Sequence, residues 1–200
     1  MAHDRAARLT AAETALTRAL SLAPEHALAH FYMGVIKLHT NRAAEGVAEY
    51  EQALALDRNL AAAHGYIGQA MYMIGRGERT ETHIQEALRL SPRDTNAYLW
   101  IAFTGLAKIY LRSDEEAVAR FRHAIETNRN FPLAHFCLAA ALAHLGRLAE
   151  ARSAVQAGLA LDPTFTVSRF RNSLATDNSI YLTGREHIYE GMRKAGVPEG

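Results

Sequence analysis

The sequence predicts an all-α fold of stacked antiparallel helix pairs, and three observations lead to this prediction. A nine-residue pattern recurs along the chain, beginning at residues 22, 56, 90, 127 and 161, which indicates a repeat of about 34 residues. Within each interval the apolar residues follow helical spacing in two runs separated by a break. Alternating apolar and polar runs bounded by turn signals, which would indicate strands, are absent from the sequence.

The first complete unit shows where the helices are expected. Residues 27–40 have the spacing of one helix and residues 43–56 that of a second, with a turn between them. In later units the same turn contains Gly75 and Gly146. Glycine suits the end of a helix because it adopts the left-handed conformation without steric cost.

Composition excludes several classes of protein. The chain has 200 residues, of which 49% are hydrophobic and 22% charged, with a formal net charge of +1 and a single cysteine. A disulfide scaffold is therefore excluded, and there is no bulk charge to attract nucleic acid or anionic lipid. The longest apolar stretch, residues 133–145, is too short to span a bilayer, and no secretory signal opens the chain. We expect a cytoplasmic protein without nucleic-acid or membrane partners.

Two motifs recur at fixed places in the predicted helices. The first helices share a large-x-x-large-small pattern: His30-x-x-Met33-Gly34, His64-x-x-Ile67-Gly68, Tyr98-x-x-Ile101-Ala102 and His135-x-x-Leu138-Ala139. The second helices share a large-x-x-small pattern, clearest in Tyr50-x-x-Ala53 and Phe121-x-x-Ala124. A 34-residue unit with these motifs resembles the tetratricopeptide repeat. The resemblance covers nearly the whole chain and implies a right-handed superhelical solenoid whose first helices line a concave face.

The resemblance also predicts how the chain is divided. Residues 1–26 match only the second helix of a truncated repeat, residues 27–165 match four repeats, and residues 166–200 match a degenerate repeat that forms a C-terminal cap. In addition, residues 189–199 resemble the closing segment of bacterial proteins in which a class III adenylate or guanylate cyclase domain, or a DNA-binding regulator domain, precedes such repeats. This second resemblance implies the regulatory C-terminal region of a bacterial signalling protein of the cyclase type.

The sequence does not predict a catalytic or metal site, and no cofactor is expected. His26 and His30 stand four residues apart, as in zinc sites, but no acidic residue lies between them. His30 also occupies a repeated position, as do His64 and His135, where a large side chain packs against the preceding unit. Cys137 has apolar neighbours, which raise the pKa of a thiol. An enzyme that uses histidine and cysteine is therefore the least favoured interpretation.

The resemblance indicates which side chains point into the concave groove, and they are mostly aromatic or aliphatic and uncharged. These residues are Phe31, Tyr32, Val35, Tyr66, Gln69, Tyr72, Leu99, Trp100, Phe103 and Phe136. Large exposed apolar patches are uncommon in monomers. We therefore expect the groove to hold an apolar or amphipathic segment, which could be a helix of the same chain, a second copy in a homodimer, or part of a partner protein. The alternative is that several of these residues only pack between adjacent helices.

The predicted function is that of a non-catalytic protein–protein interaction module. A free-standing scaffold or chaperone-like adaptor is the alternative. Relatives that bind the carboxylate tails of chaperones carry lysine, asparagine and arginine on the inner face. The matching positions here hold Phe31, Val35, Tyr66, Asn96 and Trp100. The resemblance therefore argues against an acidic C-terminal peptide as the ligand.

Overall fold

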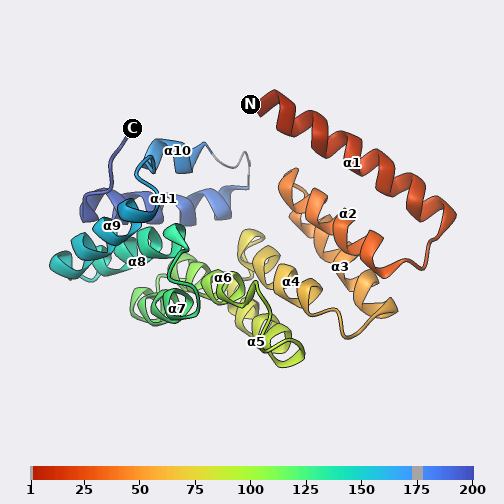
Figure 1. Ribbon diagram of the computed structural model, residues 1–200, viewed down its shortest axis with the longest axis horizontal. Helices are drawn as coiled ribbons and strands as arrows, with labels where there is room; N and C mark the ends of the chain where they lie inside the picture. Colours follow the sequence, from red (N-terminus) through yellow and green to blue (C-terminus); the bar gives the residue numbers. More distant parts are fainter. Residues whose placement is uncertain (1, 173–177) are drawn as a thin grey trace.

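The computed structural model describes residues 2–172 and 178–200, so residue 1 and residues 173–177 of the expected cap lie outside the described part. The described residues form helices and contain no strand (Figure 1). The helices are α1 (Ala2–Leu22), α2 (Ala27–His39), α3 (Ala43–Leu56), α4 (Ala61–Met73), the 3-10 turn η1 (Gly77–Arg79), α5 (Thr80–Leu90), α6 (Ala97–Tyr110), α7 (Asp114–Thr127), α8 (Pro132–His144), α9 (Leu148–Leu161), α10 (Val167–Arg171) and α11 (Ser179–Ala195).

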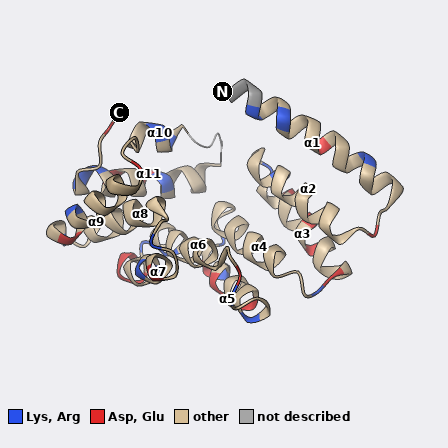
Figure 2. Ribbon diagram, viewed as in Figure 1, with Lys and Arg blue, Asp and Glu red and all other residues tan. Residues whose placement is uncertain are grey.

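Four helix pairs, α2/α3, α4/α5, α6/α7 and α8/α9, follow one another along a curved arc (Figure 1). The first helices α2, α4, α6 and α8 lie toward the inside of the arc, and the second helices lie outside. Figure 2 shows α4, α6 and α8 almost free of charged residues, whereas α3, α5 and α7 carry many. The predicted all-α solenoid of antiparallel helix pairs is confirmed.

The turns inside the four pairs share one backbone geometry. In each turn one residue takes the left-handed conformation: Asn41 (φ 62°), Gly75 (φ 82°), Arg112 (φ 60°) and Gly146 (φ 73°). The following N–H then donates to a carbonyl five residues earlier, as from Arg42 to Lys37 at 2.8 Å. This bond satisfies a carbonyl at the end of the first helix, which is why the turn recurs. Two of the four turns use glycine, as the sequence predicts, and two accept a side chain in this conformation.

The segment after the fourth pair departs from the repeat pattern. The short α10 is followed by the long α11, which lies along α8 and α6 on the inner side of the arc (Figure 1). Helix α11 begins after Asn178, whose side chain accepts a hydrogen bond from the Tyr181 N–H at 3.0 Å, and it ends at Gly196 in the left-handed conformation. The chain therefore places a helix of its own on the concave face.

Within residues 2–172 and 178–200, no helix is both long enough and apolar enough to cross a membrane.

Candidate binding cavity

Two glycines allow α11 to lie close to the first helices. A Cβ atom at Gly184 would collide with the ring of Tyr110 on α6, and a Cβ atom at Gly191 would lie 2.6 Å from the carbonyl oxygen of Ala140 on α8. Real Cβ atoms do not approach other atoms so closely. Any larger residue at these two positions would therefore push α11 away from the inner face.

The end of the chain is fastened to the start of α10. The N–H of Val167 donates to the carbonyl of Pro198 at 2.9 Å, and the N–H of Ser168 donates to the carbonyl of Glu199 at 2.9 Å. Arg193 of α11 pairs with Glu199 at 2.8 Å. Residues 189–199 thus close the C-terminal part of the fold and hold α11 in place.

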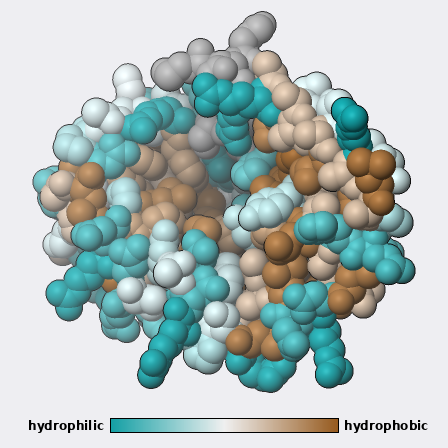
Figure 3. Space-filling view, turned by 45° about the vertical axis from the view of Figure 1, so that its right-hand side comes forward, coloured by the Kyte–Doolittle hydropathy of each residue, from teal (hydrophilic) through white to brown (hydrophobic). Residues whose placement is uncertain are grey.

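A cavity of about 400 Å³ remains between α11 and the inner helices. Figure 3 shows the molecule hollowed here, with hydrophobic residues on the wall of the hollow. The lining comes from six helices besides the α11 residues: Arg5, His39, Tyr66, Gln69, Tyr72, Leu99, Phe103, Leu106, Tyr110, Leu133, Phe170, Tyr181, Arg185 and Ile188. Ten of these fourteen residues are tyrosine, phenylalanine, leucine or isoleucine, and none is acidic.

The aromatic wall is continuous from the repeats to α11. The ring centroids of Tyr72 and Tyr110 lie 5.2 Å apart, and that of Tyr181 on α11 lies 5.4 Å from Tyr110. Burial raises the pKa values of Tyr72 and Tyr110 well above the ordinary value for tyrosine. Both phenols therefore stay neutral, and the wall offers rings and uncharged hydroxyl groups rather than charge.

Arg185 is the exception on this wall because it is a buried cation. Its side chain is 7% exposed and lies 4.1 Å from the ring centroid of Phe170. Its Nε donates to the hydroxyl of Tyr189 at 2.6 Å, one Nη to the carbonyl of Phe170 at 2.7 Å, and the other to the hydroxyl of Tyr181 at 3.4 Å. All three acceptors are neutral, and a guanidinium group has five N–H donors. Two donors therefore remain, and no described carboxylate forms an ion pair with Arg185.

The opposite edge of the cavity is also basic. Nη2 of Arg5 on α1 lies 3.4 Å from Nδ1 of His39 at the end of α2. Burial, and then the positive charge of Arg5, lowers the pKa of His39. The lowered pKa favours the neutral form of His39, so Arg5 and Arg185 are the two cationic side chains on the lining of this apolar cavity.

The ten groove residues expected from the sequence divide into two groups. Five of them line the cavity: Tyr66, Gln69, Tyr72, Leu99 and Phe103. The other five lie elsewhere: Phe31, Tyr32, Val35, Trp100 and Phe136. Tyr32 is 54% exposed on α2, beyond the reach of α11.

Trp100 and Phe136 pack between helices instead of lining the cavity. Trp100 is 1% exposed and lies against Gly65 of α4, and Phe136 stacks on Phe165 at 3.8 Å between ring centroids. Gly65 on α4 leaves room for the Trp100 ring, and Gly158 on α9 leaves room for the Phe136 ring. For these two residues the structure has the packing between adjacent helices that the sequence left open as the alternative.

Sequence reasoning missed the residues that α11 contributes. Tyr181, Arg185 and Tyr189 are spaced four apart, which places them on one face of a helix. That spacing was visible in the sequence, but nothing there indicated that this face would meet α4 and α6.

Cys137 and His30, one of the three histidines at the repeated position, have structural surroundings. Cys137 is fully buried, and burial raises the pKa of its thiol to about 12, so it stays protonated near neutral pH. Nδ1 of His30 lies 2.7 Å from Glu49, and its Nε2 lies 2.9 Å from the carbonyl of Pro24. These contacts of His30 join the α2/α3 pair to the preceding turn. The Cys137 thiol, with so high a pKa, is a poor nucleophile.

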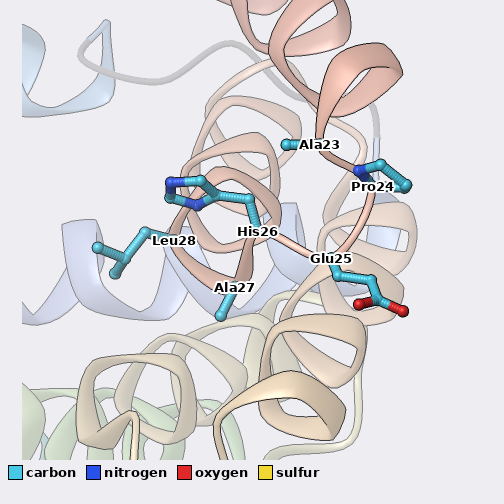
Figure 4. Close-up of a pocket in the computed structure, with 6 residues that line it drawn as sticks. All are labelled: Ala23, Pro24, Glu25, His26, Ala27 and Leu28. Carbon is cyan, nitrogen blue, oxygen red and sulfur yellow. The ribbon is translucent and has the colours of Figure 1, made fainter.

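A second hollow, of about 520 Å³, lies at the turn between α1 and α2 and is lined by residues 23–28 (Figure 4). Figure 4 shows the ring of His26 and the carboxylate of Glu25 pointing in different directions. Nδ1 of His26 accepts a hydrogen bond from the Ala29 N–H at 3.2 Å and so caps α2. The polar groups here do not converge, and His26 already has a structural partner.

Comparisons with known proteins agree with this architecture. Family models for the tetratricopeptide repeat match residues 1–61 and residues 132–165. Among curated proteins, the peroxisomal targeting signal receptor of Kluyveromyces lactis is 27% identical over 88% of this chain. The aligned region is 37% of that receptor, so this chain spans little more than a third of the relative's length.

Solved structures with the same arrangement come from several systems. PilW, a type IV pilus biogenesis factor, has a TM-score of 0.75 at 17% identity, covering 96% of this chain and 86% of its own. PilF of Pseudomonas aeruginosa has a TM-score of 0.72 at 18% identity, covering 97% and 90%. YrrB, described as a tetratricopeptide repeat protein with an unusual peptide-binding site, has a TM-score of 0.59 at 24% identity, covering 90% of each chain. Tetratricopeptide repeats are thus identified in residues 1–61 and 132–165, and the shared folds show that the chain is an all-α solenoid of stacked helix pairs.

Proposed function

We propose that this chain is a protein-interaction module that binds an amphipathic segment of a partner protein in the cavity between α11 and the inner helices. Apolar side chains of the segment pack against Tyr66, Leu99 and Phe103, and a carboxylate of the segment accepts hydrogen bonds from Arg185. The observation that carries the proposal is a buried arginine on the wall of an apolar cavity that forms no ion pair with a carboxylate of the described residues.

The size and lining of the cavity favour a few side chains of a peptide. About 400 Å³ lies within the range of ligand pockets in proteins and is too small for a whole helix. Half-buried Tyr66 and Leu99 offer apolar surface that a partner can cover. Aromatic residues contribute strongly to such interfaces because they bury a large area at little entropic cost.

The charge of Arg185 favours a partner that carries an acidic group. Buried charges in proteins are normally paired, since taking an ion out of water costs several kcal/mol. Arg185 has rings and neutral oxygens around it and two donors left over. A carboxylate accepts two parallel hydrogen bonds from a guanidinium group, which is both strong and specific. The family resemblance argued against an acidic C-terminal peptide from the residues at five positions of the repeats. Arg185 lies on α11 and is not one of those five residues.

The test is selection from a random peptide library displayed on phage, using the full chain as bait. We expect the selected peptides to combine apolar or aromatic residues with an aspartate or glutamate. Leu99→Glu should abolish their binding, because it places a carboxylate in an apolar wall that has none and so repels the carboxylate of the peptide. Arg185→Met should weaken binding about tenfold or more, since the carboxylate then loses its buried partner.

Arg171→Met is the matched control, because Arg171 is an exposed arginine on α10 that also contacts Tyr189. It should leave peptide affinity unchanged. Peptides that bind Leu99→Glu as well as the parent would contradict the cavity as the site. Peptides that lose binding in Leu99→Glu but not in Arg185→Met would contradict the role of the carboxylate.

A second copy of the chain is the other occupant that the sequence suggested. Sedimentation velocity separates the two, and we expect a monomer that stays monomeric in Leu99→Glu. A dimer that Leu99→Glu dissociates would show that the cavity holds another copy of this chain and would contradict a separate partner.

A finer prediction rests on residues 189–199 alone. Their likeness to the tails of cyclase-type signalling proteins suggests that this module regulates a catalytic or DNA-binding domain in the cytoplasm of a bacterium. Sequencing the reading frame upstream of Met1 tests it, with such a domain as the expected result. A frame that starts at Met1 would favour the free-standing scaffold or adaptor.

A further inference from the structure

Three potential metal ligands meet where α8 ends against α11. His144 is the last residue of α8, and His187 and Glu190 lie one turn apart on α11. One ligand atom of each residue lies within 4.8 Å of the others. His187 is buried, His144 is half-buried and Glu190 is exposed, so the group opens to solvent on one side.

Existing hydrogen bonds place both imidazoles in a form that can bind a metal. Nε2 of His144 lies 2.7 Å from the carbonyl oxygen of His187. A carbonyl only accepts, so this Nε2 carries the hydrogen and Nδ1 keeps its lone pair. Nε2 of His187 lies 3.2 Å from the carboxylate of Asp114, which leaves Nδ1 of that ring as the second lone pair. Histidines that bind metals usually donate their other N–H to a carbonyl or a carboxylate in this way.

The two rings are also packed together. Their centroids lie 3.5 Å apart with an angle of 18° between the ring planes. Two stacked rings resist carrying two positive charges, which favours the neutral form that metal binding requires. A cation between the rings and the Glu190 carboxylate would hold all three groups without that repulsion.

We propose that His144, His187 and Glu190 form a zinc site that fastens α11 to α8. Two imidazole nitrogens and one carboxylate, with a position open to water, suit Zn²⁺. Zinc ligand atoms lie roughly 3.4 Å apart when the metal–ligand distances are about 2.0–2.1 Å. The three ligand atoms already lie within 4.8 Å of one another, so they would draw together by at most about 1.4 Å. To bind zinc, Glu190 gives up its exposed ion pair with Lys194, in which Oε1 and Nζ lie 2.8 Å apart. Exposed ion pairs of this kind contribute little to stability.

The zinc site affects the cavity because α11 carries Tyr181 and Arg185, which line it. Zinc bound between α8 and α11 fixes the helix that forms one wall of the cavity. This inference does not depend on the proposed peptide binding. It departs from the sequence-based expectation of no metal site, because His144 and His187 lie 43 residues apart and only the position of α11 brings them together.

The test uses the full chain after treatment with a chelator, with Zn²⁺ as the probe. Isothermal titration should give one zinc per chain, and free zinc at about 100 times Kd should raise the melting temperature by roughly 5–10 °C. Cobalt bound in place of zinc should give the visible absorption of a tetrahedral site.

Glu190→Gln is the decisive variant, because this exposed residue can change without disturbing the fold. It should weaken zinc binding about tenfold or more, and His187→Ala should abolish it together with the cobalt absorption. Glu186→Gln, an exposed glutamate one turn earlier on α11, is the control and should bind zinc like the parent. Absence of a one-to-one complex in the parent, or parent-like affinity in Glu190→Gln, would overturn the assignment.

Discussion

At the N-terminal end of the arc an inner position of the repeat faces solvent, whereas the equivalent position at the C-terminal end is buried where α11 packs on α8. The sixth residue of the first unit, counted from residue 27, is Tyr32, which is 54% exposed. The sixth residue of the fourth unit, counted from residue 132, is Cys137, which is 0% exposed. A repeat position therefore does not by itself determine burial, because contacts from outside the repeat, here from α11 on α8, also decide which inner residues meet water.

The same comparison locates the candidate site. The cavity lies at the boundary, where the inner wall passes from open to covered, and it takes residues from both regions. Leu99 and Phe103 come from the third unit, and Tyr181 and Arg185 come from α11. A solenoid without α11 would present a broad open groove, whereas this chain presents a smaller cavity with a buried cation.

The largest expected effect on stability comes from placing a negative charge at each of the equivalent positions Tyr32 and Cys137, in separate variants. Cys137→Asp should lower the free energy of unfolding by about 4 kcal/mol or more, because a carboxylate would be buried without a partner. Tyr32→Asp should lower it by less than about 1 kcal/mol, since this side chain already meets water. Urea unfolding of both variants measures the difference, and equal losses would contradict the contrast between the two regions.

A second prediction concerns a substitution on α11 that displaces this helix from the inner face and leaves the sequence of the repeats unchanged. Gly184→Val should cost about 1–3 kcal/mol, because the added methyl groups collide with the ring of Tyr110. Hydrogen exchange should show protection lost over α11 and retained over α2 to α5. Thr183→Val, at the exposed neighbouring position, is the control and should stay within about 0.5 kcal/mol of the parent. Unchanged protection of α11 in Gly184→Val would show that the glycine contact does not hold this helix.

A third prediction concerns how the stability of the protein depends on pH through two histidines of the α4/α5 pair, in the open region. Burial lowers the pKa values of His64 and His83, whose ring centroids lie 6.0 Å apart. The attraction of Glu86 opposes this effect at His64, and Arg89 and Arg79 reinforce it at His64 and His83 respectively.

Because the unfolded chain then binds protons more readily, stability is complete above about pH 6.5 and falls as the pH drops through the ordinary histidine value toward the lowered one. We expect the urea midpoint to decrease modestly from about pH 7.5 to about pH 5. The double variant His64→Gln, His83→Gln should reduce this loss of stability in part, and half-buried His39 and buried His187 should account for the remainder. An identical pH profile in the double variant would rule out this pair as a source of the acid sensitivity.

The smallest predicted effect concerns the turns, which are the same in both regions. Arg112→Gly should stabilise the protein by about 0.5–1 kcal/mol, because glycine adopts the left-handed conformation without strain. Gly146→Ala should destabilise it by about 1 kcal/mol, since a Cβ there meets nothing within 4 Å and only the backbone conformation matters. Urea midpoints measure both changes, and a loss of stability in Arg112→Gly would mean that its side chain makes a contribution larger than the strain.

Much of the fold could be predicted because it depends on local sequence. The 34-residue period, the helical spacing of apolar residues and the glycines at Gly75 and Gly146 act within one helix pair, so the limits of α3 (Ala43–Leu56) match the predicted helix. The cavity could be predicted only in part. The repeat positions of Tyr66, Leu99 and Phe103 predict that these side chains line the cavity. Trp100 and Phe136 do not line it, because their rings pack against glycines of neighbouring helices.

The sequence by itself determined the helices, their pairing and the apolar character of the inner face, because each of these follows from contacts between residues close along the chain. Only the tertiary structure decided that α11 lies inside the arc. That placement depends on Gly184 meeting Tyr110 and on Gly191 meeting Ala140, contacts between residues about 50 to 75 positions apart. It is also what buries Arg185 beside the cavity and brings His187 against His144, because a helix folded back onto the repeats joins groups that no local pattern connects.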